Sequence, residues 1–217
     1  KGIPIIPGIN DPTGIEQAMV MGLDVVKFFP AQQSGGIEMI KAMSAPYGGV
    51  TFMPTGGVNP KNVNDYLAFP KIICCGGSWM VKPEMIAAGD FDGIKALVRE
   101  AVDTMLGLKF RHVGINPCGN TSEGTAKVLG DYFSFGSKVT SKSIFVSPEL
   151  EIMNDKGPGT HGHIAIETTN VDRAVYHLQQ RGIEVDMSTA QYNPDGSMRF
   201  VYLQNEIGGF AYHLVKR

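Results

Sequence analysis

The feature that most constrains the fold is a series of short segments without a polar face, which alternate with helical segments over about the first hundred residues. Strands are expected at residues 3–7, 24–29, 50–54 and 72–75. A strand that is apolar on both sides is buried on both sides, and such strands occur in parallel sheets that helices cover. The first half of the chain is therefore predicted to be an α/β structure with a parallel sheet.

The segments between these strands have helical patterns. Helices are expected at residues 11–23, 36–44 and 92–105, and the last of these has apolar residues at helical spacing. A further helix is expected to begin at Asn59, because Asn is a good capping residue and Pro60 suits the first helical position.

The pattern changes after a short junction at residues 106–109. Residues 111–217 are interpreted as a weak repeat of about fifty residues with the order βαβββ in each copy. The expected elements of the first copy are a strand at 111–116, a helix at 121–133 and strands at 143–147 and 149–154. Those of the second are a strand at 163–168, a helix at 171–181 and strands near 199–204 and 210–215. The predicted domains are residues 1–108 and 109–217.

Charge and composition exclude several classes of protein. The net charge of −2 gives no electrostatic basis for binding nucleic acid or an anionic membrane. No apolar run approaches the roughly 20 residues of a membrane span, and the start of the sequence has no signal-peptide pattern. Three cysteines without C-x-x-C spacing fit a reducing compartment. We expect a globular cytoplasmic protein that acts on a small molecule.

Lys27 is the unusual residue of the first half, because it interrupts the apolar run V-V-K-F-F. Burying an unpaired ammonium group is costly, and desolvation favours the neutral form of an amine. A neutral amine can attack a ketone and form an iminium, which serves as an electron sink for carbon–carbon cleavage. The alternative is a lysine that reaches solvent from the end of its strand or pairs with an acid.

Three motifs resemble one enzyme family. K-F-F-P-A at residues 27–31, P-T-G-G-V at 54–58 and I-C-C-G-G-S-W at 73–79 are similar to the 2-keto-3-deoxy-6-phosphogluconate aldolase family, which also includes 4-hydroxy-2-oxoglutarate aldolase activity. The resemblance runs from residue 1 to about 106. It implies that Lys27 is the Schiff-base lysine, that the reaction needs no metal or cofactor, and that the enzyme is a trimer. It also implies a (β/α)₈ barrel whose strands five to eight are the four predicted here.

The turns after the last two predicted strands are rich in glycine, and a phosphate site is often built there in such barrels. The resemblance assigns phosphate binding to Gly56, Gly57, Gly77 and Ser78, and Thr55 lies in the same turn as the first pair. Phe29 and Pro30 are expected to shape the pocket around the pyruvyl group. Ordinary tight turns are the alternative. The expected products are pyruvate and glyceraldehyde 3-phosphate, or pyruvate and glyoxylate from the rival substrate 4-hydroxy-2-oxoglutarate.

The resemblance places the family's general base and two further substrate-binding residues in the first half of the barrel, outside this sequence. Four strands cannot close an eight-stranded barrel. We therefore expect either a fragment or a half-barrel that another chain completes, and we expect the 217-residue chain alone not to cleave the substrate at a useful rate.

The second half resembles the glyoxalase/vicinal-oxygen-chelate superfamily through H-I-A-I-E-T-T-N-V-D-R-A-V at residues 163–175 and L-Q-Q-R-G-I-E-V at 178–185. The resemblance implies metal ligands on the first and last strand of each repeat. The matching positions are His112, Glu151, His163 and His213, with Glu149, His161 and Tyr212 as neighbouring alternatives. Such a set suits Zn²⁺, Mn²⁺ or Fe²⁺. A metal-free module for ligand binding or assembly is the alternative, and either version makes this module the working part of the chain.

Overall fold

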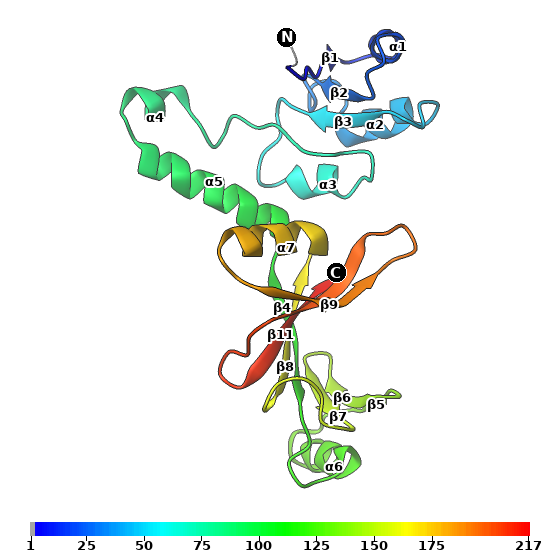
Figure 1. The fold of residues 1–217 in the computed structure, drawn as a ribbon, viewed down its shortest axis with the longest axis vertical. Coiled ribbons are helices and arrows are strands. Elements are labelled where there is room, and N and C mark those ends of the chain that lie inside the picture. Colours follow the sequence, from blue (N-terminus) through cyan, green and yellow to red (C-terminus); the bar gives the residue numbers. More distant parts are fainter. Residues whose placement is uncertain (1–2) are drawn as a thin grey trace. The chain divides into compact units, whose positions relative to one another are not determined.

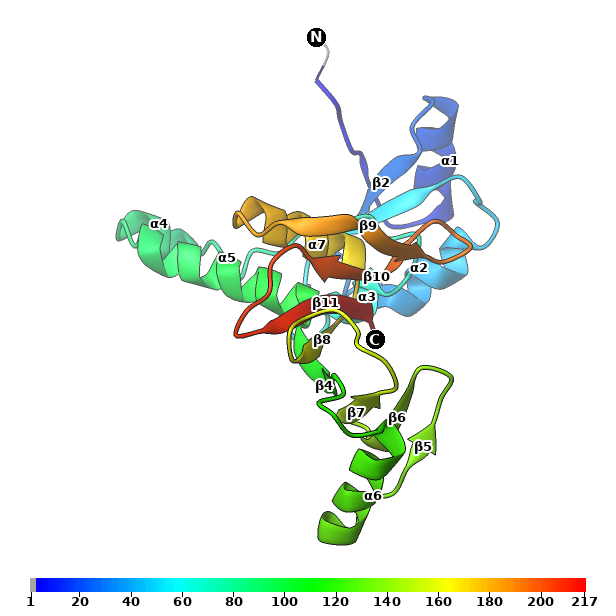
Figure 2. The same ribbon diagram turned by 60° about the horizontal axis from the view of Figure 1, so that its bottom comes forward.

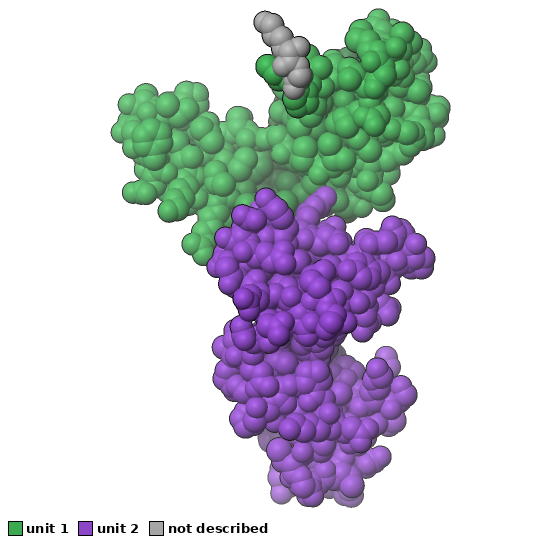
Figure 3. Space-filling view, in the orientation of Figure 1, with its two compact units in different colours: residues 1–105 green, residues 106–217 purple. Residues whose placement is uncertain are grey.

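The computed structural model describes residues 3–217, so the first two residues of the predicted first domain lie outside it. The chain forms two compact units, which divide between Met105 and Leu106 and are coloured separately in Figure 3. The boundary expected at residues 108 and 109 falls in the link between the last helix of the first unit and the first strand of the second. Each unit is described by itself.

The first unit contains a parallel sheet of three strands in the order β1-β2-β3 (Figure 1). The strands are β1 (Gly8–Ile9), β2 (Val25–Phe28) and β3 (Thr51–Pro54). The helices are α1 (Pro12–Val20), α2 (Gly36–Ser44), α3 (Val63–Leu67), α4 (Pro83–Ala87) and α5 (Phe91–Leu106). The parallel pairing agrees with the expectation from the sequence, whereas the position of these strands within a larger barrel stays a prediction.

Burial alternates along β2, although its sequence is almost wholly apolar. Val26 and Phe28 are fully buried, and they pack in one core with Phe52 of β3, Ile15 of α1 and Ile40 of α2. Val25 and Lys27 are half-buried on the other face. The strand therefore has one closed face and one partly open face, and Lys27 lies on the open one.

Three predictions for the first unit were wrong in detail. The strand expected at residues 3–7 is β1 at Gly8–Ile9, since Pro4 and Pro7 lack the N–H groups that a strand interior needs. Residues 72–75 form no regular strand: Ile72 makes an isolated parallel bridge to Phe52 of β3, and Gly76, just beyond the run, makes another to Thr55 after β3. The helix expected from Asn59 begins at Val63, and α4 was not expected.

The late start of α3 has a local cause. The side chain of Asn59 accepts a hydrogen bond from the Lys61 backbone N–H at 2.9 Å, which stabilises a turn in place of a helix. Asn62 instead occupies the position that precedes the helix.

Lys71 ties the loop after α3 to the end of α2. Its ammonium group donates hydrogen bonds to the backbone carbonyls of Ser44 and Tyr47, at 2.7 Å each. Carbonyl groups at the end of a helix lack intrahelical partners and carry partial negative charge, so a cation is favourable there. Lys71 is thus a structural lysine.

The second unit contains one sheet of eight strands in the order β5-β6-β7-β4-β8-β11-β10-β9. Its first half consists of β4 (Lys109–Ile115), α6 (Ser122–Phe133), β5 (Lys138–Val139), β6 (Ser143–Ser147) and β7 (Leu150–Met153). Its second half consists of β8 (Gly162–Thr168), α7 (Val171–Gln180), β9 (Val185–Tyr192), β10 (Met198–Leu203) and β11 (Phe210–Lys216). Both halves have the order βαβββ, and the sequence patterns missed only β5 and β9.

The two halves join through the antiparallel pair β4–β8, and each first strand pairs in parallel with the last strand of its own half. The first and last strands of both halves thus lie together at the centre of the sheet, while α6 and α7 lie at different ends of the unit (Figures 1 and 2). Thr168 of β8 is fully buried, and its hydroxyl donates to the Leu106 carbonyl at 2.7 Å. Among the residues that the structure describes, no helix is both long enough and apolar enough to cross a membrane.

Candidate functional site

Lys27 lies near the C-terminal end of β2, between Gly8 of β1 and Met53 of β3. Its backbone N–H donates to the Pro7 carbonyl at 2.8 Å, which fixes the strand at this point. Its ammonium nitrogen is 4.9 Å from the centre of the Phe29 ring. The C-terminal end of a parallel strand is where the active sites of α/β barrels lie, and the structure places the Lys27 amine there.

The loop after β2 is in contact with the turn after β3. A Cβ atom on Gly56 would lie 3.1 Å from the Pro30 Cα and 3.2 Å from the Phe29 ring, and Gly56 has φ +96°. The Ala31 N–H donates to the Thr55 carbonyl at 2.8 Å. The Thr55 hydroxyl oxygen is buried without a hydrogen-bond partner. A small residue is required at Gly56, because any side chain there would push on the loop that follows Lys27.

The second glycine-rich segment, residues 73–79, reaches the same rim through Gly76, whose N–H donates to the Pro54 carbonyl at 2.9 Å. Gly77 lies under Trp79, since a Cβ atom at Gly77 would fall 1.6 Å from a ring carbon of that side chain. The predicted residues therefore form two sets. One set lies at the ends of β2 and β3, and the two residues of the other set come directly after the bridges at Ile72 and Gly76. The first set is Lys27, Phe29, Pro30, Thr55, Gly56 and Gly57, and the second is Gly77 and Ser78.

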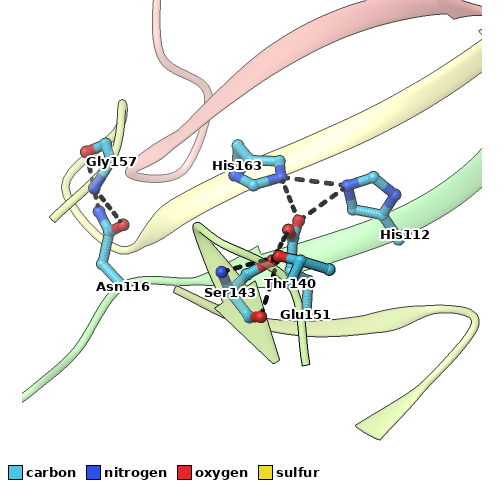
Figure 4. Close-up of polar contacts among 7 residues, drawn as sticks. All are labelled: His112, Asn116, Thr140, Ser143, Glu151, Gly157 and His163. Atoms are coloured by element: carbon cyan, nitrogen blue, oxygen red, sulfur yellow. Dashed lines mark hydrogen bonds and ion pairs between the residues drawn. The ribbon is translucent and has the colours of Figure 1, made fainter. Parts of the chain in front are cut away.

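A second group of polar side chains gathers on four adjacent strands of the second unit, and Figure 4 shows three of its members, His112, Glu151 and His163. The Nε2 atoms of His112 on β4 and His163 on β8 are 3.1 Å apart. The Glu151 carboxylate on β7 lies 3.3 Å from the first of these nitrogens and 3.1 Å from the second. His213 on β11 completes a group of three imidazoles whose ligand atoms all lie within 4.8 Å of one another.

The strand register explains why these side chains converge. Gly114 is paired with Glu151 on one side and with His163 on the other. In the next row, Ala165 is paired with His112 and with His213. Paired residues share a face of the sheet. The side chains of His112, Glu151, His163 and His213 therefore lie on one face, around the small residues Gly114 and Ala165.

The alternative ligands lie outside this group. Glu149 is exposed and contacts Ser147, and His161 packs its ring near Phe210. Tyr212 is adjacent to His213 in β11, and successive residues of a strand point to opposite faces. The structure thus brings together the four primary residues and none of these three.

The ionisable side chains of this group shift one another's pKa values. Burial by itself would raise the pKa of the Glu151 carboxyl, but hydrogen bonds from His112, His163 and Ser143 outweigh it and hold that pKa well below its usual range. Burial, together with the nearby His163 and His112, lowers the pKa of His213 to about 3. Burial and the charge of Glu151 raise the pKa of Tyr202, whose ring packs on His213, to about 12. The group thus holds an ionised carboxylate beside a neutral imidazole.

Four supporting residues were missed from the sequence. The Ser143 hydroxyl donates to Glu151 at 2.5 Å, and Thr140 lies 3.0 Å from that hydroxyl. Tyr202 contacts His213. Gly114 lies beneath the His163 ring, and a Cβ atom there would be 2.0 Å from the ring. A glycine inside the strand R-H-V-G-I-N was a usable signal, because glycine in a strand often marks the close approach of another group.

The donor set fits a divalent transition metal. Zinc-bound nitrogen and oxygen ligands at about 2.05 Å in a tetrahedron are separated from each other by about 3.3 Å, close to the 3.1–3.3 Å found among His112, Glu151 and His163. The ligand atom of His213 lies within 4.8 Å of those of the other two histidines. Three imidazoles and one carboxylate are ligands that zinc, manganese and iron accept. The Nδ1 atoms of His163 and His213 are buried without hydrogen-bond partners, which leaves the rings without the outer hydrogen bonds common at metal sites.

Comparison with known proteins confirms the aldolase resemblance of the first half. Residues 1–97 match the family model described as KDPG and KHG aldolase. A 2-dehydro-3-deoxy-phosphogluconate aldolase from Haemophilus influenzae is 52% identical over 100 residues, which are 46% of this chain and 47% of the relative. The chain spans about half the length of the curated relatives it matches.

Two solved structures are similar to different parts of the chain. A KDPG aldolase from Legionella pneumophila, with pyruvate captured as a covalent carbinolamine intermediate, is 42% identical with a TM-score of 0.43, over 45% of this chain and 47% of that one. A methylmalonyl-CoA epimerase from Mycobacterium tuberculosis is 17% identical with a TM-score of 0.37, over 52% of this chain and 89% of that one. Scores of this size support no assignment of activity, so the glyoxalase-like interpretation of the second half stays a prediction.

Proposed function

We propose that the first unit is part of a class I aldolase for 2-keto-3-deoxy-6-phosphogluconate and that Lys27 is its Schiff-base residue. The observation that carries the proposal is the Lys27 amine at the C-terminal end of β2, inside the segment that matches the aldolase family. A related enzyme with 52% identity over this segment bears this activity in its name. The family resemblance supports a trimer, and the cysteine pattern supports a cytoplasmic location.

The proposed chemistry follows from the amine. Lys27 attacks the C2 carbonyl of the substrate and forms a carbinolamine, which loses water to give an iminium. A base then takes the proton of the C4 hydroxyl, the C3–C4 bond breaks, its electron pair moves toward the iminium to give an enamine, and glyceraldehyde 3-phosphate leaves. Protonation of the resulting enamine at C3 and hydrolysis release pyruvate and regenerate the amine. No step needs a metal or another cofactor.

The residues at the rim supply binding in this proposal. The backbone N–H groups of Gly56, Gly57 and Gly77 and the Ser78 hydroxyl hold the phosphate, since glycine lets the backbone approach an anion closely. Phe29, Pro30 and Thr55 enclose the pyruvyl part, and the unpartnered Thr55 hydroxyl gives that part a hydrogen-bonding group. 4-Hydroxy-2-oxoglutarate, which has no phosphate, is the proposed second substrate.

A chimera tests this proposal. The part of the Haemophilus influenzae relative that precedes its matching segment is fused before residue 3, so that a complete barrel can form. We expect aldol cleavage and borohydride trapping of pyruvate on the peptide that contains Lys27, and we expect both to be lost in Lys27→Met. A matched control is Lys61→Met, which removes another lysine of the same unit. A folded chimera that traps no pyruvate would refute the proposal, whereas the 217-residue chain alone is expected to show no useful turnover.

A second function is proposed for the second unit, which holds the converging imidazoles. We propose that His112, Glu151, His163 and His213 bind a divalent transition metal, with Zn²⁺, Mn²⁺ and Fe²⁺ as the candidates. The support is the spacing of the donor atoms of His112, Glu151 and His163, which matches that of ligands around one ion, together with the His213 imidazole, whose ligand atom lies within 4.8 Å of those of the other two histidines. Such an ion would act as a Lewis acid toward an oxygen-bearing substrate. A metal-free module for ligand binding or assembly is the competing proposal.

Metal titration separates these two possibilities. The chain is stripped of metal and titrated with each ion, and we expect one ion per chain. His163→Ala is expected to abolish stoichiometric binding, whereas His161→Ala, which removes an exposed imidazole two residues away, is expected to leave binding unchanged. Glu151→Gln and Glu149→Gln form a second matched pair. If both members of each pair lost metal affinity equally, the proposed site would be contradicted. If the unaltered chain bound no metal, the metal-free module would be favoured.

A further inference from the structure

A cavity of 740 Å³ lies in the second unit beside the β5–β6 end of the sheet. Its walls come from β4, from residues 134–140 after α6, and from β6 with the turn that follows it. Cavities of this size hold small organic ligands. Neither the aldolase proposal nor the metal proposal assigns it a ligand.

The charged residues of this cavity are positive. Arg111 and Lys138 line it, and none of its described lining residues is acidic. Arg111 is 59% exposed and contacts Glu167 at 3.3 Å, but the same carboxylate also contacts Arg217 at 2.9 Å. Glu167 cannot neutralise both guanidinium groups, so Arg111, Arg217 and Glu167 together have a net positive charge. Lys138 has no ion-pair partner among the described residues. The cavity therefore favours an anion.

The rest of the lining suits an apolar body. Phe135 and Phe145 contribute aromatic rings, and Val146 and Pro148 add apolar surface. Arg111 has a planar guanidinium group with several donors, which matches the two oxygens of a carboxylate. The combination of two cations with two aromatic rings indicates a carboxylate attached to a ring or to another bulky apolar group.

The cavity adjoins the imidazole group. The ring of Phe145 packs edge-on against His112, with ring centres 5.6 Å apart. A shift of register between Phe110 and His112 makes Arg111 the extra residue of β4, directly beside His112. Thr140 lines the cavity and also contacts Ser143, which donates to Glu151. A ligand in the cavity would thus lie next to residues that touch the proposed metal ligands.

We propose that this cavity binds an organic acid that carries an aromatic or bulky apolar group. Arg111 and Lys138 hold the carboxylate, and Phe135 and Phe145 pack on the apolar group. The inference goes beyond the metal proposal and does not require it, because the anchoring groups are side chains of the protein itself.

Calorimetry with phenylacetate tests the inference on the 217-residue chain. We expect one phenylacetate per chain, both with Zn²⁺ added and after metal is stripped with a neutral chelator. Phenylacetamide has the same shape without the charge, and acetate has the charge without the ring. Each is expected to bind at least tenfold more weakly than phenylacetate. Equal binding of phenylacetate and phenylacetamide, or no binding of phenylacetate at millimolar concentration, would overturn the inference.

Variants locate the binding. Arg111→Gln and Lys138→Gln are each expected to weaken phenylacetate binding at least tenfold, and Arg111→Lys is expected to recover part of the loss. Lys127→Gln is the control, because Lys127 lies on the exposed surface of α6 and pairs with Asp131. Unchanged affinity in both cavity variants, with circular dichroism equal to that of the unaltered chain, would refute the assignment. His163→Ala separates the two proposals, because it removes the proposed metal ligand and is expected to leave phenylacetate binding intact.

Discussion

Gly114→Ala provides the sharpest test of the proposed metal centre, because it adds one methyl group without changing any proposed ligand. Gly114 is the central residue of its row, between Glu151 and His163. Its added Cβ atom would lie 2.0 Å from the His163 ring, whereas ordinary contact begins at 3.4 Å. The ring must therefore retreat by about 1.4 Å. A shift of that size is large beside the 3.1 Å that separates its Nε2 atom from Glu151.

Gly114→Ala is expected to lower both the stability of the unit and its affinity for zinc. Overpacking a buried position typically costs about 1–3 kcal/mol of stability. Displacing one ligand of a metal site through its support typically lowers metal affinity by about 10–100-fold. We therefore expect Gly114→Ala to fold, to melt at a lower temperature, and to bind zinc at least tenfold more weakly in competition with a chromophoric chelator.

Gly136→Ala is the matched control for this prediction. Gly136 lies in the same unit, has an ordinary φ, and has no atom within 4 Å of the position of an added Cβ. We expect its zinc affinity and melting temperature to equal those of the unaltered chain. If Gly114→Ala bound zinc as tightly as Gly136→Ala, the ring of His163 would not be held where the structure places it or would not be a ligand, and the reasoning would fail.

Three further changes test individual hydrogen bonds. Lys71→Met removes the ammonium group that joins two carbonyls at the end of α2, and urea unfolding should show a loss of about 2–3 kcal/mol, against less than about 0.5 kcal/mol for the exposed Lys41→Met. Ser143→Ala leaves one Glu151 oxygen without its donor and should weaken zinc binding by roughly tenfold in the chelator assay. Thr168→Val should cost only about 1 kcal/mol in thermal unfolding, because a backbone N–H still donates to the same carbonyl.

Elements with strong local signals were predictable from the sequence. The helix expected at residues 36–44 is α2 at Gly36–Ser44, and the helix expected at 171–181 is α7 at Val171–Gln180. For α7 the signal was complete: the side chain of Asn170 accepts from the Arg173 N–H at 2.8 Å, and Gly182 follows the last turn with φ +78°. Caps are local interactions, so the sequence contains what is needed to find them.

Elements that depend on their neighbours were not predictable. β5 and β9 are the two outermost strands of the sheet, and neither has the strict alternation of apolar and polar residues that identifies a half-buried strand. Residues 72–75 are the reverse case, because this apolar run was expected to be a strand and forms only an isolated bridge at Ile72. Whether such a run becomes a strand depends on backbone partners from elsewhere in the chain, and the run itself does not contain this information.

The candidate ligands were predictable and their supports were not. Positions at the first and last strand of each repeat led to His112, Glu151, His163 and His213, which the structure brings together. Ser143 comes from a strand that is adjacent only to β7 and β5, so its hydrogen bond to Glu151 follows from the pairing of β6 with β7. Register of this kind is fixed by tertiary packing, and a one-residue slip would turn the hydroxyl to the other face.

The two units differ in what their residues can do by themselves. In the second unit each half supplies two of the proposed ligands, and the pair β4–β8 sets them against one another. Its donor set is complete within the unit, so metal binding should stabilise the pairing of the two halves.

In the first unit, β1 and β3 place the Lys27 amine, but the resemblance assigns the proton-transfer group to the half of the aldolases that this chain does not span. An amine without that group can form an iminium more readily than it can cleave a carbon–carbon bond, because cleavage requires a proton to leave the C4 hydroxyl. In the proposed function, trapping of pyruvate and turnover of the substrate are therefore expected to be separable, and the chimera should gain turnover to a greater degree than it gains trapping.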